Sequence, residues 1–510
     1  MQKVLYSLTF KLAMLILIIV GSMAATNYTK PDLSFTADSL IKVLQAKGWV
    51  ENDFQSQEVF YLGKRIDPDF LFFPIKTIST KSGEKIGPFP IANTLITVPF
   101  VLFNEIGWLI YFCSILFCLY LVLLYALTKR ILVPIAGLLA TPLFHHFISF
   151  SDVAVAAFLV LIAILFISRE NSIFSGKPAL PAFLSGLLIG LSCWFRPEAL
   201  ILFICLTGCA ALVKFFSEEN RLSQDWKQIS VFLLGFIVVF STFILYNFLN
   251  YDSLLGPRVA SNEEISDLNF FIKFSDIQSL LVAGNGRLGF FGFSPWYLFL
   301  LLFGFLKWKS LQENTQIWIL TFCTNLIAIG ILTPNDSNID WGSRYLTCSV
   351  FIPLLLLNEI KFPENTNKAI RNSVLLGFGI LLFYSINVNM KAIQIMRKIA
   401  IQLDQIQTAI PWNQSKIFIT RKIHIANTFG LKYLSQTILL VKKSSDLDEI
   451  LQSHREGTIV LIEDPFDKSL STFVKRKFPE KFNSREIPNP ANKLLHLVEI
   501  SPKINSSLKK

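Results

Sequence analysis

The stretch SNIDWGSRYL (residues 337–346) decides how this chain is interpreted. It lies between two apolar runs, IWILTFCTNLIAIGIL (residues 317–332) and TCSVFIPLLLL (residues 347–357). Such runs are typical of helices inside a lipid bilayer. A turn between two helices needs only a glycine or an asparagine, but this one carries charged and aromatic side chains: Asp336, Asp340, Trp341 and Arg344. Charge at a membrane edge is costly unless it is paired or functional, so other charged clusters on the same side would indicate a site.

The composition identifies the class of protein. Of the 510 residues, 52% are hydrophobic, 48 are Phe, and the mean hydropathy is +0.51. Apolar runs near the length of a membrane span recur over the first three quarters of the chain, which predicts a polytopic membrane protein. The net charge of +11 comes largely from short loops between apolar runs. It therefore indicates orientation in the membrane, and no nucleic acid partner is expected.

About eleven spans are expected, from the rule that roughly 20 apolar residues cross the hydrocarbon core. They start near residues 8, 106, 131, 151, 181, 198, 229, 288, 315, 345 and 371. FPIANTLITVPFVLFN (residues 89–104) is weaker, and could be an interfacial helix or a short extra span. The first 25 residues could be a retained anchor or a cleaved signal peptide. If the weak stretch does not cross, the short basic loops fall on one side, the cytoplasmic one.

In this orientation three long regions lie outside the cytoplasm: a first loop (about 26–105), a second loop (about 251–287) and the tail. Within the tail, SKIFITRK (residues 415–422) and GTIVLIEDP (residues 457–465) are typical of short buried strands. SSDLDEILQSHR (residues 444–455) is typical of an amphipathic helix. The sequence therefore predicts an all-α membrane domain over 1–390 and a small extracytoplasmic α/β domain over 391–510.

The first outer loop contains ADSLIKVLQ, which predicts a helix with apolar residues on one side. Asp38, Lys42 and Gln45 recur at three- and four-residue spacing on the other side. Asp38 could simply cap this helix, because Asp is a favoured N-cap residue. The functional interpretation is a carboxylate held a few residues beyond a membrane anchor.

Other outer turns also carry charge. HHFISFSD includes His146 and Asp152, which could bind a metal or form an aromatic turn in which Asp152 caps the next helix. WFRPEAL carries Arg196 and Glu198 close to hydrocarbon depth. Arg258 lies at one end of the second long loop, where nearby glycines would let backbone amides approach an anion. Five such clusters on one side predict a shared site for an anionic ligand.

These motifs resemble those of the polytopic GT-C glycosyltransferases, which use polyprenyl-phosphate sugars. Within them the chain looks most like bacterial, spirochaete-type transferases of lipopolysaccharide and other surface glycans. The resemblance covers roughly residues 1–390 and rests on six motifs: ADSLIKVLQ, GPFPIAN, WFRPEAL, YDSLLGPR, GRLGFFGFSPW and WGSRYL. It implies a site beside the first outer loop, with Asp38 at the position of the catalytic base. Many members have two adjacent acids here, whereas Ser39 follows Asp38, which leaves Asp32 and Asp67 as alternatives.

The implied reaction moves a sugar from a polyprenyl phosphate to a hydroxyl of a glycan, lipid or protein, with inversion at the anomeric carbon. Asp38 would accept the hydroxyl proton, and Arg344, Arg258 and Arg196 would bind the phosphate. Further candidate site residues are Lys42, Gln45, Asp152, Glu198, Asp340 and Trp341. No metal or other cofactor is expected; a divalent metal, if one takes part, would sit at Asp152 and His146.

The implied location is the bacterial inner membrane, with the site and the tail on the periplasmic side and membrane lipids as further partners. Three alternatives remain open: a transporter or flippase of a lipid-linked sugar, a ligase of whole glycans, and a structural scaffold. A transporter would predict charges within the spans and inverted repeats. In this chain the charges lie mainly at one rim.

Overall fold

The computed structural model describes residues 2–30, 33, 35–168, 179–216, 222–263, 270–335, 342–359, 367–453, 457–488 and 494–503. The chain divides into two compact units, and each is described by itself. The first comprises Met1–Thr29, Phe89–Asn93 and Gly107–Met396. The second comprises Lys30–Pro88, Thr94–Ile106 and Arg397–Lys510. The second unit therefore combines most of the predicted first outer loop with the predicted tail domain.

The first unit is built from helices. Six helices in the described part of the chain contain windows apolar and long enough to cross a membrane. They are α1 (Gln2–Tyr28), α4 (Trp108–Thr128), α9 (Glu198–Phe215), α10 (Leu222–Asn250), α15 (Glu313–Leu332) and α17 (Lys368–Ala409), which continues into the second unit.

Shorter helices complete the unit. They are α5 (Leu132–Leu139), α6 (Leu143–Ile148), α7 (Asp152–Ile167), α8 (Ala179–Cys193), α11 (Pro257–Glu263), α12 (Phe270–Leu281), α13 (Phe290–Phe293), α14 (Trp296–Leu306), η4 (Trp308–Ser310), η5 (Arg344–Ser349) and α16 (Phe351–Glu359). The strands β3 (Ala283–Gly284) and β4 (Arg287–Leu288) form an antiparallel hairpin. Helix α3 (Ile91–Leu102) begins in this unit; at twelve residues, about 18 Å, it is too short to cross the bilayer core.

The span expected from residue 131 does not form as one helix. The chain breaks between α5 and α6, where Pro142 cannot donate a backbone hydrogen bond. Side chains from other helices satisfy the carbonyl groups exposed at the break. Asn389 Nδ2 donates to the carbonyls of Leu138 and Leu139, and Trp296 Nε1 donates to that of Ala140. Such bonds allow non-helical backbone inside a membrane protein.

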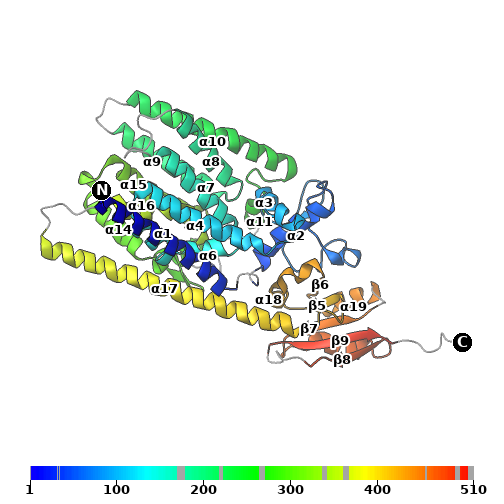
Figure 1. Cartoon of the computed structure of the whole chain (residues 1–510). Coiled ribbons are helices and arrows are strands. Elements are labelled where there is room, and N and C mark those ends of the chain that lie inside the picture. The colour runs from blue at the N-terminus through cyan, green and yellow to red at the C-terminus, as the bar shows by residue number, and fades with distance from the viewer. Residues whose placement is uncertain are drawn as a thin grey trace. The chain divides into compact units, whose positions relative to one another are not determined.

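Helices α8 and α10 pack together through glycines (Figure 1). A Cβ atom at Gly186 would lie 2.1 Å from the Phe232 carbonyl oxygen, and one at Gly235 would lie 2.2 Å from that of Phe183. Small residues allow this close approach of backbones, which is a common basis of helix association in membranes.

The second unit contains helix α2 (Ala37–Glu51), η2 (Leu62–Arg65) and a hairpin of β1 (Ile78–Ser79) and β2 (Lys85–Ile86). Its tail part forms a five-stranded sheet in the order β6-β5-β7-β9-β8. The strands are β5 (Ile417–Thr420), β6 (Thr437–Leu440), β7 (Ile459–Glu463), β8 (Phe482–Glu486) and β9 (His496–Pro502). Strands β6, β5 and β7 are parallel and fully buried, whereas β9 runs antiparallel to β7 and β8.

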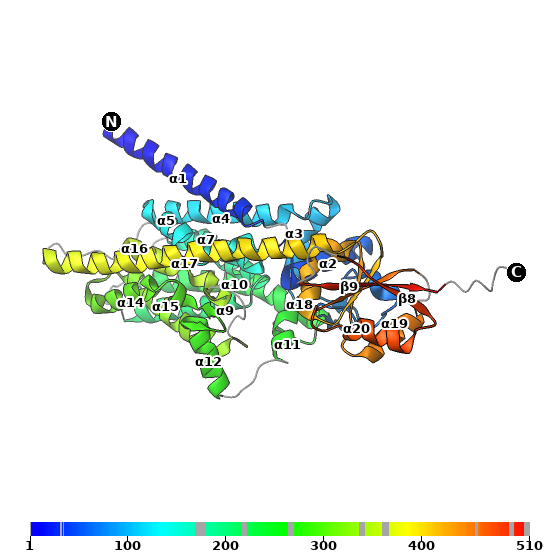
Figure 2. The same ribbon diagram turned by 90° about the horizontal axis from the view of Figure 1, so that it is seen from below.

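Four helical segments connect these strands: α18 (Ile423–Ala426), η6 (Asn427–Leu434), α19 (Ser444–Ser453) and α20 (Ser469–Lys477). Helices α19 and α20 contact each other on one side of the sheet (Figure 2). Strands β5 and β7 and helix α19 form where the sequence indicates them, because their apolar residues follow the periods of a buried strand and an amphipathic helix.

The predicted first outer loop packs directly on the tail within this unit. The backbone N–H of Leu440, at the end of edge strand β6, donates to the Phe72 carbonyl at 2.7 Å. The Phe73 and Tyr433 rings meet edge to face at 6.4 Å, and Lys30 forms an ion pair with Asp404 at 3.4 Å. The tail thus supports the loop that carries Asp38.

Candidate active site

The N-termini of two helices bring charged residues together inside the first unit. Asp152 is the first residue of α7 and Glu198 is the first residue of α9, positions at which the helix dipole stabilises a carboxylate. Arg196 lies between them and is 2% exposed. Its Nη1 is 3.0 Å from Asp152 Oδ2, and its Nη2 is 3.2 Å from Glu198 Oε1. A buried guanidinium is therefore held by two carboxylates.

Tyr345 extends this group. The Arg196 guanidinium carbon lies 5.6 Å from the centre of the Tyr345 ring, and that of Arg344 lies 5.8 Å from it. The Tyr345 hydroxyl donates to Asn335 Oδ1 at 2.9 Å, which fixes the ring. Two arginines thus contact one anchored aromatic ring, a geometry that stabilises cations.

Arg258 is the third arginine of the group, and its charge acts on Tyr345 together with those of Arg344 and Arg196. Its guanidinium carbon lies 4.8 Å from the centre of the Phe89 ring. The turn before it depends on Gly256, which has φ +87° and packs against the Asn247 side chain. We call these six residues the arginine cluster: Asp152, Arg196, Glu198, Arg258, Arg344 and Tyr345.

The arginine cluster carries three positive and two negative charges. Arg196 is the residue that both carboxylates hold, whereas Arg344 is partly exposed and Arg258 is buried. An excess of positive charge in a poorly hydrated setting favours an anion, because water screens it little there.

The structure also bears on the predicted metal position. The charges of Arg344 and Arg196 act on His146, and Asp152 is paired with Arg196. Among the described residues, no group of three or more His, Cys, Asp or Glu side chains could hold a metal. The positive charges of Arg196 and Arg344 would repel a metal ion at this position, so Asp152 and His146 do not fit a divalent metal. That the reaction needs no metal stays a prediction from the sequence.

Asp38 lies in the second unit, in the first turn of α2. The N-cap is Thr36, which forms a capping box with Ser39, so Asp38 is not the cap. Its side chain is exposed. Residues 39–46, which follow it in the helix, are buried, including Lys42 and Gln45 at 2% and 1% exposure. Asp38 is thus an exposed carboxylate on a firmly held helix.

Gln45 has a fixed partner outside its helix. Gln45 Oε1 accepts a hydrogen bond from the backbone N–H of Gly87 at 3.1 Å, which ties α2 to the segment before α3. A Cβ atom at Gly87 would lie 2.9 Å from Ile41 and 3.1 Å from this same oxygen. Gln45 therefore serves the packing of α2, in a place where the sequence predicts a candidate site residue.

The two acids that the sequence offers as alternatives to Asp38 are Asp67 and Asp32, and the structure describes only Asp67. Asp67 is 2% exposed and accepts hydrogen bonds from the backbone N–H groups of Leu71 and Phe72 and from the Tyr61 hydroxyl, at 2.7, 2.8 and 3.0 Å. Burial and the neighbouring Asp67 raise the pKa of Tyr61, which keeps the phenol a donor. Asp67 therefore stabilises the loop. Asp32, Asp336, Asp340 and Trp341 lie outside the described residues.

The structure thus brings together Arg196, Asp152, Glu198, Arg344 and Arg258, all within the first unit. Asp38, Lys42 and Gln45 belong to the second unit. Tyr345 and Phe89, the aromatic partners of these arginines, are not among the residues predicted from the sequence. Both occur inside motifs quoted above. Tyr345 directly follows Arg344 in WGSRYL, and Phe89 lies in the proline turn of GPFPIAN, so each motif contained a signal for an aromatic partner.

Comparison with known proteins places the fold. No family model and no curated protein matches the chain. Among solved structures, it is similar to the archaeal oligosaccharyltransferase AglB from Archaeoglobus fulgidus in complex with an inhibitory peptide and a dolichol-phosphate. The TM-score is 0.52 at 9% identity, over 99% of this chain and 75% of that chain. The predicted membrane protein of GT-C-like fold is confirmed at this level. The closer likeness to spirochaete-type transferases stays a prediction.

Proposed function

We propose that this protein is a membrane glycosyltransferase that moves a sugar from a polyprenyl phosphate to a hydroxyl group of an acceptor. Two observations support the proposal: the GT-C-like fold and the buried arginine cluster. The similar AglB structure contains a dolichol-phosphate, which belongs to the same chemical class as the proposed donor. The acceptor is a lipopolysaccharide-type glycan, a lipid or a protein, and the reaction takes place on the periplasmic face of a bacterial inner membrane.

The observation that carries the proposal is that the three arginines differ in their carboxylate contacts. Arg196 is already held by two carboxylates, so its part is to build the arginine cluster. Arg344 and Arg258 supply the positive charge for the phosphate. Arginine suits this task, because its planar fork can donate two hydrogen bonds to one phosphate and stays charged when buried.

The proposed reaction is one displacement. The acceptor oxygen bonds to the anomeric carbon while the bond from that carbon to the phosphate oxygen breaks, which inverts the centre. The acceptor proton passes to the Asp38 carboxylate. The polyprenyl phosphate leaves with one more negative charge than it had in the donor. Arg344 and Arg258 stabilise this charge more in the transition state than in the ground state, which lowers the barrier.

A second candidate is the transfer of a whole oligosaccharide, which is favoured by the oligosaccharyltransferase among the similar structures. The chemistry at the anomeric carbon would be the same, so the arginine cluster does not separate the two. The mass added to the acceptor separates them, because one sugar and a complete glycan differ by several sugar units.

The test uses the full chain in proteoliposomes with radiolabelled polyprenyl-phosphate sugars and extracted envelope acceptors. We expect Arg344→Ala to lower transfer by about 10²–10³-fold, the usual effect of removing one group that stabilises developing negative charge. Arg130→Ala, which removes an exposed arginine just after α4, is the matched control. If Arg344→Ala and Arg130→Ala transfer sugar at the rate of the unchanged protein, the proposed phosphate site is wrong.

A further inference from the structure

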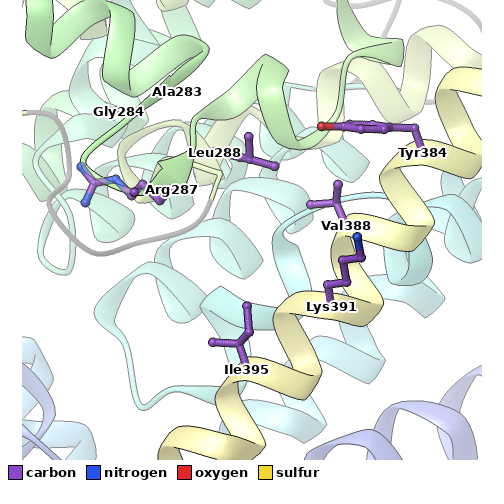
Figure 3. Close-up of a pocket in the computed structure, with 9 residues that line it drawn as sticks. Ala283, Gly284, Arg287, Leu288, Tyr384, Val388, Lys391 and Ile395 are labelled. Atoms are coloured by element: carbon purple, nitrogen blue, oxygen red, sulfur yellow. The ribbon is translucent and has the colours of Figure 1, made fainter.

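A cavity of about 580 Å³ lies in the first unit, apart from the arginine cluster. Figure 3 shows its two walls, the β3–β4 hairpin and one side of α17. Gly284 and Leu288 belong to the hairpin, and Tyr384, Val388, Lys391 and Ile395 belong to the helix. Its volume falls within the range of roughly 300–1,000 Å³ that is common for small-molecule sites.

Both walls follow from the sequence. The hairpin turns at Asn285 and Gly286, whose φ angles of +51° and +75° match the two-residue turn that Asn-Gly favours. The helix residues recur at spacings of four, three and four, so they share one side of α17. The walls are therefore regular elements with fixed shape.

The position of Lys391 along α17 relates the cavity to the bilayer. Nineteen uncharged residues separate Arg371 from Lys391. At 1.5 Å per residue they span about 30 Å, which equals the thickness of the hydrocarbon core. Lys391 therefore reaches the level of lipid head groups, and Tyr384, two helical turns before it, lies at the depth of the lipid chains.

The lining is largely apolar, and Lys391 lies between Val388 and Ile395 on its α17 wall (Figure 3). The Lys391 ammonium points along the cavity towards Val388, whereas the Arg287 guanidinium points away from α17 (Figure 3). Among the residues that the structure describes, no carboxylate forms an ion pair with Lys391, which is exposed. A lysine ammonium directed along apolar walls, with the Arg287 guanidinium turned away, matches an amphiphile with an anionic head group and a hydrocarbon chain.

We propose that this cavity binds an acidic phospholipid of the surrounding bilayer, with its phosphate at Lys391 and one chain along Leu288, Val388 and Tyr384. The lipid would brace the hairpin against α17. An anionic head group is favoured because each lysine near a membrane surface contributes about 1 kcal/mol of attraction to acidic lipids. The inference does not rest on the proposed glycosyltransferase function.

The test is native mass spectrometry of the full chain in detergent, titrated with phosphatidylglycerol or phosphatidylethanolamine. We expect tighter retention of phosphatidylglycerol, and a loss of about fivefold in its affinity in Lys391→Gln. Lys368→Gln, which changes an exposed lysine near the other end of the apolar stretch, should bind as the unchanged protein does. Ala283→Phe fills the cavity from the hairpin, keeps all charges, and should weaken binding of both lipids.

Three results would overturn the inference. One is equal retention of both lipids by the unchanged protein. Another is unchanged phosphatidylglycerol binding in both Lys391→Gln and Ala283→Phe. The third is one-for-one displacement of phosphatidylglycerol by polyprenyl phosphate, which would assign the cavity to the sugar donor. None of these measurements uses sugar transfer, so the inference and the proposed function fail separately.

Discussion

The arginine cluster and the helix that carries Asp38 hold their charged groups in different ways. In the cluster, charged groups come from four separate segments, and the buried Arg196 is held by Asp152 and Glu198. On α2, residues 39–46 are buried and the Asp38 carboxylate is exposed. The comparison shows that an anion site such as the arginine cluster needs several charges that only the tertiary structure brings together. A proton acceptor such as Asp38, by contrast, needs only one group on a rigid helix.

The largest expected effect concerns the arginine cluster. Arg196→Met removes the common partner of the Asp152 and Glu198 carboxylates, whose side chains are 6% and 12% exposed. Breaking a buried ion pair from one side costs about 3–5 kcal/mol, since it leaves uncompensated charge. We expect a marked fall in the thermal unfolding temperature of the detergent-solubilised protein.

The matched control is Lys30→Met, which breaks the exposed pair with Asp404, whose side chains are 43% and 49% exposed. Exposed ion pairs contribute about 0–1 kcal/mol, so this variant should unfold near the original temperature. Equal losses in Arg196→Met and Lys30→Met would show that the Arg196 contacts do not hold the arginine cluster together.

Asp38→Asn tests the other side, and its effect should appear in rate alone. The amide keeps the size of the side chain but cannot accept a proton from an attacking hydroxyl. We expect transfer to fall by about 10²–10⁴-fold, the usual contribution of a general base. Because Asp38 is exposed and Thr36 is the N-cap, stability should remain nearly unchanged. Transfer assays and unfolding curves on the same preparation separate the two quantities.

Asp67→Asn is the matched acid with the opposite expectation. Its carboxylate accepts three hydrogen bonds in a buried loop, so the amide would leave at least one donor poorly satisfied. We expect a loss of about 1–3 kcal/mol in stability. A variant Asp67→Asn of normal stability that lost transfer as completely as Asp38→Asn would move the base from Asp38 to Asp67.

The sequence predicts the class of fold better than the details of the site, for physical reasons. Long apolar runs require a bilayer, so the membrane domain follows from composition. The break between α5 and α6 depends on Asn389 and Trp296, which come from distant helices and give no local signal. A pairing across 44 residues, between Asp152 and Arg196, likewise exists only once the start of α7 and the segment before α9 come together in the folded chain.

The same reasoning applies to α2. Its apolar spacing predicts the helix, and Thr36 and Ser39 fix its start through a capping box. The burial of Lys42 and Gln45 is not visible in the helix alone, because the tail and the segment before α3 enclose it. Asp38 is a candidate base through family resemblance, and the structure adds only that it is exposed and well supported.

The smallest expected effect asks whether the tail supports the helix of Asp38. Gly430, in η6 of the tail, has φ +53°, and a Cβ atom there would lie 3.3 Å from the carbonyl oxygen of Phe35, just before α2. Gly83 is the matched control, since it has φ +89° and open space around its Cβ position. Alanine at either site meets an unfavourable backbone conformation, at about 1 kcal/mol. Only Gly430→Ala adds a steric contact.

We therefore expect Gly430→Ala to cost about 2 kcal/mol and Gly83→Ala about 1 kcal/mol, from the added strain of a crowded site. The sharper readout is hydrogen exchange of the α2 amides, residues 37–51. Exchange should rise in Gly430→Ala and stay the same in Gly83→Ala, because only the former disturbs the segment that leads into α2. If both variants left these amides equally protected, α2 would owe its rigidity to its own loop, and the tail would have no part in holding Asp38.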